Sequence, residues 1–381
     1  MSGHTSPPLP LPLRNSDPSC ARRRLVLDAH WVHNGPGTHV TPDVVTIGGV
    51  TLDWIISGTG EVAIRCCGGN ALYSAVGARL WDVNVAVVSN VGDDYPEEML
   101  EAFSAADVDL SGIRRLDEPH ELVFAAQYDR SGERFAIRPS EVFPPNGIDA
   151  PEARELHPLF REPWDSDLAS HFDPMPDQVP SDYWKAGGFH VGGMRRVAQF
   201  AFVNALSKLQ ILSTLDPGLV EDQIEREQLL GKADVLLPSE TDMRWLTNEL
   251  DLDLALHYLT RLGPEAVALK LGKRGSLIYD IRADRKRHVP IYPVTAKDPT
   301  GAGDAYCGGF LAGYLETADA FEAALRATVS ASFVIEEFDA RYALRFTRQD
   351  AENRLSTLRD LVKDGEINGA YGGVGHEPDE G

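Results

Sequence analysis

The sequence has few basic residues for its length. It holds 58 Asp and Glu against 36 Lys and Arg, a formal net charge of -22 at pH 7. This charge repels the phosphates of nucleic acids and anionic membrane surfaces, so we expect neither as a partner. No apolar run approaches the ~20 residues that span a bilayer, and prolines interrupt the N-terminal stretch where a secretory signal needs an apolar helix. The sequence therefore predicts a cytoplasmic protein.

Cysteine is also scarce. The spacing of Cys20, Cys66, Cys67 and Cys307 matches neither a disulfide framework nor a set of zinc ligands. Cys66 and Cys67 are adjacent and cannot form an unstrained bridge with each other. We expect reduced thiols that are buried as small hydrophobic side chains.

Two widespread phosphate-binding motifs are missing. No G-x-x-x-x-G-K-[S/T] segment occurs, and a dinucleotide G-x-G-x-x-G would need glycine where Tyr306 stands. Any nucleotide site must therefore be built in another way.

The sequence does contain enough apolar residues for a large core, 43% of 381 residues. Residues 1–41 have no hydrophobic period and predict a disordered N-terminal tail, and residues 366–381 predict a flexible C-terminal tail. Between them, residues 42–365 predict one domain. Its periodicity weakens at about 140–185, which we interpret as an irregular insertion.

Strand-like and helix-like segments alternate along this domain. A helical face at Leu72, Val76 and Leu80 precedes a strand-like segment, and repeated strand-then-helix units follow the insertion. Such units predict an α/β fold of three layers, with a mostly parallel central sheet flanked by helices and ligands at the carboxyl edge of the strands. Strand-like segments at about 50–66 and 120–139 predict a small β flap, or lid, over that edge.

One short stretch points to chemistry. Residues 297–315 read KDPTGAGDAYCGGFLAGYL, a glycine-rich corner followed by a helical run of small residues. A helix N-terminus offers unpaired N-H groups and a positive dipole end, and glycine lets an anion approach closely. Asp304 in the first turn is suited to accept a proton from a hydroxyl group. A helix-cap aspartate after a plain glycine turn would give the same letters.

Several motifs together resemble the PfkB carbohydrate kinase family, the ribokinase-like kinases. The stretch from Asp298 to Leu315 is similar to the family's D-T-x-G-A-G-D signature and the small-residue helix after it. Segments from Cys67 to Trp81, Asp216 to Gly218, Ala233 to Asp242 and Leu269 to Asp280 follow in the family's order. The resemblance covers roughly residues 44–347 and implies a ribokinase-like fold with a PfkB-type kinase domain.

The resemblance implies an ATP-dependent kinase that transfers the γ-phosphoryl group to a hydroxyl of a small sugar or polyol. Asp304 would be the general base, and Gly301, Ala302 and Gly303 would form the anion hole. The implied substrate-binding residues are Asp53, Gly68, Gly69 and Asn70, and the implied nucleotide-binding residues are Gly272, Gly275 and Ser239. The glycines would serve equally as plain turns and Asp53 as a turn or cap residue. Lys270, Lys273 and Arg274 we interpret as a solvent-exposed basic cluster.

The chain departs from the family pattern at three places. The N-x-x-E motif reads Ser239 to Asp242, so Asp242 would bind Mg²⁺ only through water, and the nucleotide phosphates would hold most of the ion. Tyr73 replaces an asparagine and would either stack on substrate or pack in the core. Pro299 replaces a threonine, between Asp298 and Thr300, which match the place of a monovalent cation such as K⁺ in similar kinases.

Two further functions stay open. A nucleoside kinase would use Tyr73, Trp54 and Phe124 for stacking. A weakened kinase-like ligand-binding regulator would explain the altered Ser239 to Asp242 motif. In similar kinases the flap can also pair with a second subunit, which would make a homodimer.

Overall fold

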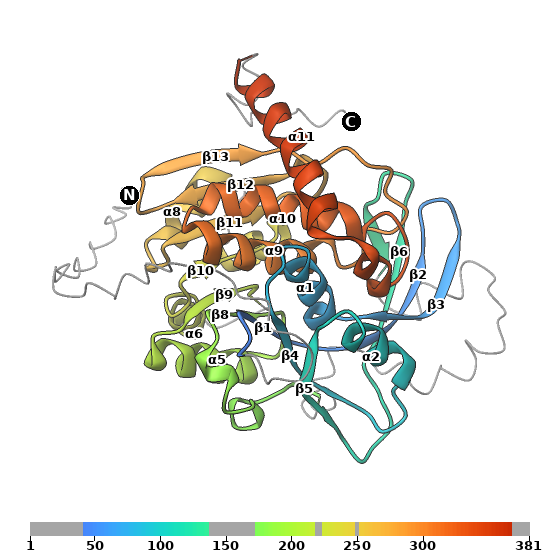
Figure 1. Cartoon of the computed structure of the whole chain (residues 1–381). Helices are drawn as coiled ribbons and strands as arrows, with labels where there is room; N and C mark the ends of the chain where they lie inside the picture. The colour runs from blue at the N-terminus through green and yellow to red at the C-terminus, as the bar shows by residue number, and fades with distance from the viewer. Residues whose placement is uncertain (1–40, 137–171, 218–222, 248–250, 368–381) are drawn as a thin grey trace, which may run out of the picture. The chain divides into compact units, whose positions relative to one another are not determined.

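A nine-stranded sheet forms the centre of the protein. The structure, a computed structural model, describes residues 41–136, 172–217, 223–247 and 251–367 (Figure 1). The strand order is β13-β12-β11-β10-β9-β8-β1-β4-β5; β12 and β13 run antiparallel to their neighbours, and the other pairs are parallel. The strands are β1 (Val44–Ile47), β4 (Val85–Val91), β5 (Asp109–Arg115), β8 (Gly188–Val191), β9 (Leu212–Leu215), β10 (Val235–Leu236), β11 (Ala266–Lys270), β12 (Ser276–Asp280) and β13 (Arg285–Val289).

Both faces of the inner strands of this sheet are buried, because these strands are apolar at successive positions. In β4, Val85 and Val87 belong to one hydrophobic cluster, and Ala86 and Val88 belong to the other. Side chains alternate between the two faces of a strand, so an uninterrupted apolar run requires a cover on each side.

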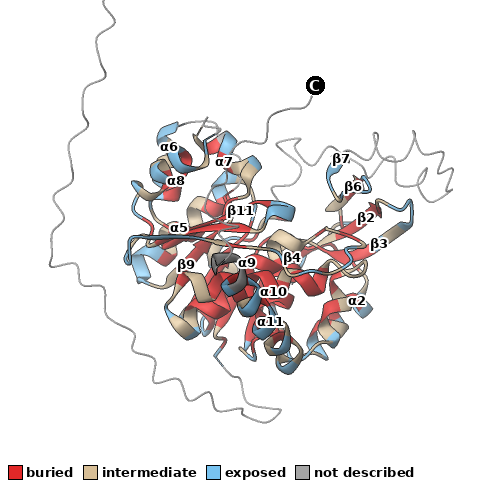
Figure 2. Ribbon diagram, turned by 90° about the horizontal axis from the view of Figure 1, so that it is seen from above, coloured by how far each residue is buried: buried red, intermediate tan, exposed pale blue. Residues whose placement is uncertain are grey.

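Helices supply these two covers. The first cluster includes residues of α1 (Asn70–Arg79), α2 (Glu97–Ser104), α9 (Ala302–Thr317), α10 (Ala320–Val334) and α11 (Arg348–Ile367). The second includes residues of α5 (Arg196–Leu209), α6 (Gln223–Leu230), α7 (Glu240–Thr247) and α8 (Leu252–Thr260). Buried positions gather in the strands and on α9 and α10, while the outer sides of α6 and α8 are exposed (Figure 2). The predicted three-layer α/β fold is therefore confirmed.

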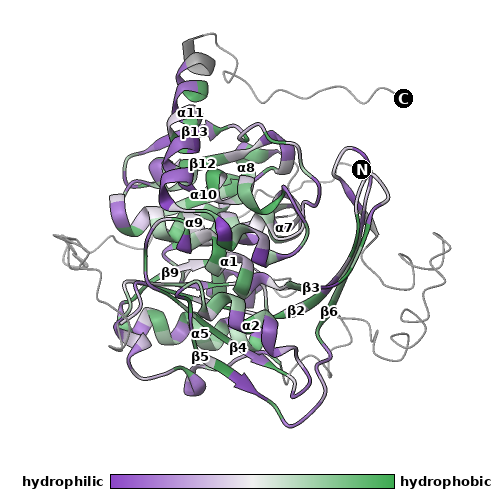
Figure 3. Ribbon diagram, turned by 45° about the vertical axis from the view of Figure 1, so that its right-hand side comes forward, coloured by the Kyte–Doolittle hydropathy of each residue, from purple (hydrophilic) through white to green (hydrophobic). Residues whose placement is uncertain are grey.

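A second, smaller sheet provides the predicted flap. Its order is β3-β2-β6-β7, with β2 (Thr51–Ile56), β3 (Val62–Gly68), β6 (Val123–Tyr128) and β7 (Arg134–Ala136), and it stands at one side of the helices (Figures 1 and 3). Three contacts tie this flap to the main body. The Tyr128 and Thr300 hydroxyls lie 2.9 Å apart, the Lys297 ammonium pairs with Glu61 at 2.9 Å, and Cys67 N-H donates to Asp339 at 2.9 Å.

Helices α1 and α9 pack at backbone distance, which explains why α9 is so rich in small residues. A Cβ on Gly308 would lie 1.8 Å from the Ser74 carbonyl oxygen, and one on Gly77 would lie 2.0 Å from the Ala305 carbonyl oxygen. Contacts this short exclude any side chain at either position. The start of α9 is therefore held against α1.

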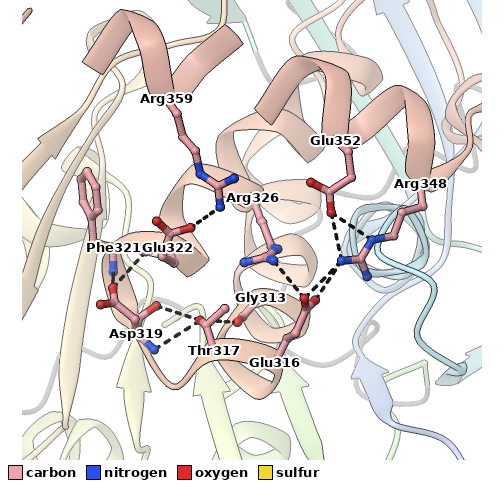
Figure 4. A network of polar contacts seen from close by, with 10 residues as sticks. All are labelled: Gly313, Glu316, Thr317, Asp319, Phe321, Glu322, Arg326, Arg348, Glu352 and Arg359. Atoms are coloured by element: carbon pink, nitrogen blue, oxygen red, sulfur yellow. Dashed lines mark hydrogen bonds and ion pairs between the residues drawn. The ribbon is translucent and has the colours of Figure 1, made fainter. Parts of the chain in front are cut away.

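A charged network fastens the last helices together (Figure 4). Glu316 at the end of α9 accepts hydrogen bonds from Arg326 of α10 at 3.0 Å and Arg348 of α11 at 3.1 Å. Arg348 also donates to the Trp81 carbonyl oxygen at 2.8 Å. Hydrophilic residues dominate the rest of α11 (Figure 3). This network places α11 across the α9–α10 layer.

Several smaller expectations can be compared with the structure. Cys66, Cys67 and Cys307 are free and buried, as predicted, whereas Cys20 lies outside the described residues. Both predicted tails, apart from residue 41 and α11 residues up to 367, and most of the 140–185 insertion also lie outside them. Sequence periodicity missed β5, an edge strand with polar residues. Within the described residues, no helix is long and apolar enough to cross a bilayer.

Replacing Gly308 with alanine should destabilise the fold. The added methyl group must push α1 away from α9, so we expect a loss of about 1–3 kcal/mol despite the better helix propensity of alanine. Urea unfolding followed by circular dichroism measures this loss. Ser104→Ala on the exposed side of α2 is the control and should change stability by less than about 0.5 kcal/mol. Equal stabilities for Gly308→Ala and the native chain would contradict the close packing.

Candidate active site

The glycine-rich corner lies where β13 leads into α9. Gly301 has a φ of 76°, in the left-handed region, and a Cβ on it would lie 2.3 Å from the Tyr73 ring. Only glycine satisfies both conditions. Ala302 N-H donates to Pro299 O at 3.2 Å, so it is partly engaged in the turn. Among the described residues, no group accepts a hydrogen bond from Gly303 or Asp304 N-H, which leaves these two donors for an anion.

Asp304 is partly buried in the first turn of α9. Ser74 Oγ donates to its carbonyl oxygen at 3.0 Å, and no described residue donates a hydrogen bond to its carboxylate. Burial, followed by the nearby Asp216 carboxylate, raises the pKa of Asp304 to about 7, and the Lys270 and Arg134 charges oppose this rise. The positive end of the helix dipole therefore does not hold the pKa of this carboxyl group at its ordinary value. A carboxyl group with a pKa near 7 suits proton transfer at neutral pH.

Asp53 and Gly68 lie in direct contact. Asp53 is 1% exposed, Thr51 Oγ1 donates to it at 2.5 Å, and a Cβ on Gly68 would lie 1.9 Å from its second oxygen. Burial raises the pKa of Asp53, and the charges of Asp298, Asp339 and Asp304 raise it further. The structure thus brings three predicted site carboxylates, Asp53, Asp298 and Asp304, into one electrostatic neighbourhood.

The Asn70 side chain, at the start of α1, forms hydrogen bonds with the backbone of two loops. Its Oδ1 accepts from Gly49 N-H at 2.8 Å, and its Nδ2 donates to Gly193 O at 2.6 Å. Gly69, which precedes it, has a φ of 100°. These contacts account for both residues structurally. Asn70 keeps one amide hydrogen and one lone pair for a substrate, so its predicted binding role stays a prediction.

Two of the proposed stacking residues are not open to a ligand. Tyr73 is 2% exposed and packs against Gly301, and Trp54 is 1% exposed. Phe124 is only partly buried. It pairs with Asp53 in the parallel register of β2 and β6, so the two side chains share a face of the flap.

The predicted nucleotide loop follows β11. Gly272 and Gly275 both have positive φ angles, of 57° and 85°, around a short 3-10 turn (Gly272–Arg274). Beside it, Ser239 and Asp242 form a reciprocal cap of α7. Ser239 N-H and Oγ donate to one oxygen of Asp242 at 2.8 and 2.5 Å, and Asp242 N-H donates to Ser239 Oγ at 3.1 Å. The second Asp242 oxygen stays available for a water or a metal.

Asp298 and Thr300, the two residues predicted to hold a monovalent cation, differ in which of their polar atoms already have partners. Asp298 is 1% exposed, one of its oxygens accepts from Thr300 N-H at 2.9 Å, and burial raises its pKa to about 6. A bound cation would compensate this buried carboxylate. The Thr300 hydroxyl is already paired with Tyr128. Within the described residues, no cluster of three or more His, Cys, Asp or Glu is arranged to hold a metal ion.

The prediction that Lys270 is solvent-exposed is wrong. Its side chain is 11% exposed and its ammonium pairs with Asp216 at 2.6 Å. By contrast, Lys273 and Arg274 have side chains 62% and 45% exposed, as predicted. Lys270 ends a strand and Asp216 follows one, and the carboxyl ends of parallel strands meet at one sheet edge. The position of both residues at strand ends was therefore a signal in the sequence for this ion pair.

Arg134 is a second residue that sequence reasoning missed. It lies on β7 of the flap, its guanidinium carbon stands 5.7 Å from the Phe124 ring centroid, and its charge lowers the pKa of Asp304. In the sequence, Arg134 follows a predicted hairpin turn, where an exposed arginine without a function is common. Only the folded flap shows that it faces the corner.

The central sheet, its two helical layers and the four-stranded flap define an α/β protein of the ribokinase fold. The chain resembles a ribokinase of Giardia lamblia with a TM-score of 0.63 at 19% identity, covering 84% of this chain and 99% of that one. A protein described as a ribokinase II of E. coli, solved with ATP and Mg²⁺, gives 0.60 at 20% identity, covering 83% and 99%.

Comparison of the sequence with known proteins gives a family match and a similar kinase. Residues 181–346 match the model of the pfkB family carbohydrate kinases. The cytidine kinase of Thermococcus kodakarensis is 28% identical over 277 residues, 71% of this chain and 88% of that protein. In sequence the chain is therefore similar to the pfkB family carbohydrate kinases, which are phosphotransferases with hydroxyl acceptors.

Replacing Asp304 with asparagine should stabilise the fold, and more so at high pH. The pKa of Asp304 is raised in the folded state, so its contribution to stability is full below pH ~4 and is lost as the pH rises through about 7. Asparagine avoids the buried charge. We expect a gain on the order of 2 kcal/mol at pH 8 and less than half as much at pH 5, measured by urea unfolding.

The control for this experiment is Asp360→Asn. Asp360 is 71% exposed on α11 and pairs only with Lys363 within the described residues, at 3.5 Å. Its replacement should leave the pH dependence of stability unchanged. A gain for Asp304→Asn that is the same at pH 5 and pH 8 would show that Asp304 is not charged at a cost in the native fold.

Proposed function

We propose that the protein transfers the γ-phosphoryl group of ATP to a hydroxyl group of a small sugar or polyol. Asp304 accepts the hydroxyl proton, and the N-H groups of the Gly301 to Asp304 corner stabilise the negative charge on the phosphoryl oxygens. The observation that supports this most is the Asp304 carboxylate, which no described group engages, at the N-terminus of α9. A helix-cap aspartate would instead bond its own first turn.

The flap supports a substrate position between Asp53 and Asp304. Asp53 lies on β2, with Gly68 leaving room for its carboxylate, and its raised pKa reports an electrostatic environment crowded with acids. Hydroxyl groups of a sugar would supply hydrogen-bond donors to Asp53. Gly68, Gly69 and Asn70 complete the proposed substrate side.

ATP and Mg²⁺ fit the opposite side of the corner. Gly272 and Gly275 would border the nucleotide, with Ser239 close to it, and the free oxygen of Asp242 would hold Mg²⁺ through water. The ion would neutralise charge on the phosphates. Asp298, with Thr300 beside it, would take a monovalent cation such as K⁺.

A nucleoside is the second candidate substrate. The match to a cytidine kinase over 88% of that protein favours it, and so does Phe124, which shares a face of the flap with Asp53. A nucleoside would place its ribose on Asp53 and its base near Phe124, because aromatic rings stack on bases. Tyr73 and Trp54 are too deeply buried to take part.

Replacing Asp304 with asparagine should abolish most phosphotransfer. Loss of the proton acceptor should lower kcat by about a hundredfold or more. The measurement is ATP turnover with pentoses, hexoses, sugar phosphates and nucleosides as acceptors, and the native chain identifies the substrate class. Asp360→Asn should turn over ATP at the native rate. If Asp304→Asn keeps the native rate, Asp304 is not the base; if no acceptor is phosphorylated, the chain is a ligand-binding relative.

Replacing Phe124 with alanine should separate the two substrate classes. For a nucleoside kinase, loss of stacking should raise KM for the nucleoside by about tenfold with kcat nearly unchanged. For a sugar kinase, KM for the sugar should change little. Tyr279→Ala on β12 is the aromatic control and should change neither KM. A tenfold rise for both classes would contradict a role of Phe124 in stacking on a base.

A further inference from the structure

A buried ion pair lies beside the glycine-rich corner. Lys270 closes β11 and Asp216 follows β9, and their side chains are 11% and 15% exposed. The Lys270 ammonium lies 2.6 Å from an Asp216 oxygen. Isolating two charges from water costs as much as their attraction returns, so such a pair is weak evidence of a role in stability alone.

The ammonium group lies against the first turns of α9. It is 3.6 Å from the position of a Cβ on Gly303 and 3.5 Å from Cys307 Sγ. Gly303 and Cys307 stand one turn apart, on either side of Asp304 along the helix. The ammonium therefore lies within van der Waals reach of the turn that carries the proposed base.

Lys270 also borders the proposed nucleotide loop. Leu271 and Gly272 follow it directly, and the Ser239–Lys270 bridge joins β11 to the capped start of α7. The same residue thus touches elements on the acceptor side and on the nucleotide side. Lys273, by contrast, is exposed to solvent and forms an ion pair with Glu133 of the flap at 3.7 Å.

The two members of the pair act on Asp304 in opposite directions. Asp216 raises the pKa of Asp304 and Lys270 lowers it. The other charged or titratable groups that face Asp304 or Lys270 from neighbouring elements are Arg134 on β7, Asp242 on α7, Asp53 on β2, Cys307 on α9 and His190 on β8. Burial lowers the pKa of His190 to about 3, so His190 is neutral at working pH.

We propose that Lys270 and Asp216 are a pair of positioning residues that act on the proton acceptor Asp304, in opposite directions, from beside the first turn of α9. Neither residue needs to touch the substrate. This inference rests on the proposed function, because it assumes that Asp304 is the base. It goes further in naming residues that tune that base.

The test is the pH dependence of kcat/KM in single and double variants. Lys270→Met should move the acidic limb of the profile upward by about one pH unit, and Asp216→Asn should move it downward by about one unit. The double variant should return close to the native profile. Lys286→Met is the matched control, since Lys286 on β13 forms an ion pair with Asp253 on α8, and its profile should not move.

A second readout does not need activity. The carboxyl ¹³C signal of Asp304, assigned by its loss in Asp304→Asn, should titrate in the apo protein with the same opposite shifts. Asp216→Asn preserves size and keeps the test decisive if Lys270→Met fails to fold. A pair that only supports the fold would lower kcat without moving either titration.

Two failures can be told apart. If Asp304→Asn is inactive but neither single variant moves the profile or the ¹³C titration, or both move it the same way, the inference is wrong and the proposed function stands. If Asp304→Asn retains native turnover, the proposed function is wrong, and shifts in the ¹³C titration alone would then describe electrostatics without catalytic meaning, which overturns the inference too.

Discussion

Helices α1 and α9 meet backbone to backbone, and the geometry of the site depends on this contact. Gly77 and Gly308 leave no side chain between the helices, so the two helix starts cannot move apart without breaking the packing. Asn70 begins α1 and the glycine-rich corner begins α9. The proposed substrate side and the proposed phosphoryl side are therefore set relative to each other by a rigid contact within the core, whereas the flap adds Asp53 and Arg134 from a separate sheet.

Acidic groups crowd the corner, and this has a consequence for charge. Asp53, Asp216, Asp298 and Asp304 all have pKa values raised first by burial. Few cations lie among them: Lys270 is paired with Asp216, and Arg134 reaches in from the flap. Such a site favours ligands that bring positive charge or hydroxyl donors, such as a metal-bound nucleotide and a polyol, and it keeps Asp304 near the point where it can exchange a proton at neutral pH.

Much of the fold could be predicted from particular residues. The apolar run in β4 indicated a strand buried on both faces, and Leu72, Val76 and Leu80 indicated the helix α1. The edge strand β5 escaped prediction, because polar residues such as Arg114 and Arg115 can lie on an edge where one side faces water. At the site, the sequence pointed to the GAGD corner, yet it placed Lys270 in solvent. Its burial depends on Asp216, which is 54 residues away in the chain.

The amino-acid order by itself determined the local features: alternation in the strands, the small-residue helix, the left-handed turn at Gly301 and the chemistry of Asp304, because each depends on neighbours within one or two turns. Only the tertiary structure decided which polar groups already have hydrogen-bond or ion-pair partners and which remain available to a ligand. One side-chain oxygen of Asn70 accepts a hydrogen bond from Gly49, and one of Asp242 accepts from Ser239. The Tyr73 ring packs against Gly301, and Lys270 forms an ion pair with Asp216. Hydrogen bonds and charge pairs join residues that are distant in sequence, so their partners and the resulting pKa values exist only once the sheet edge has assembled.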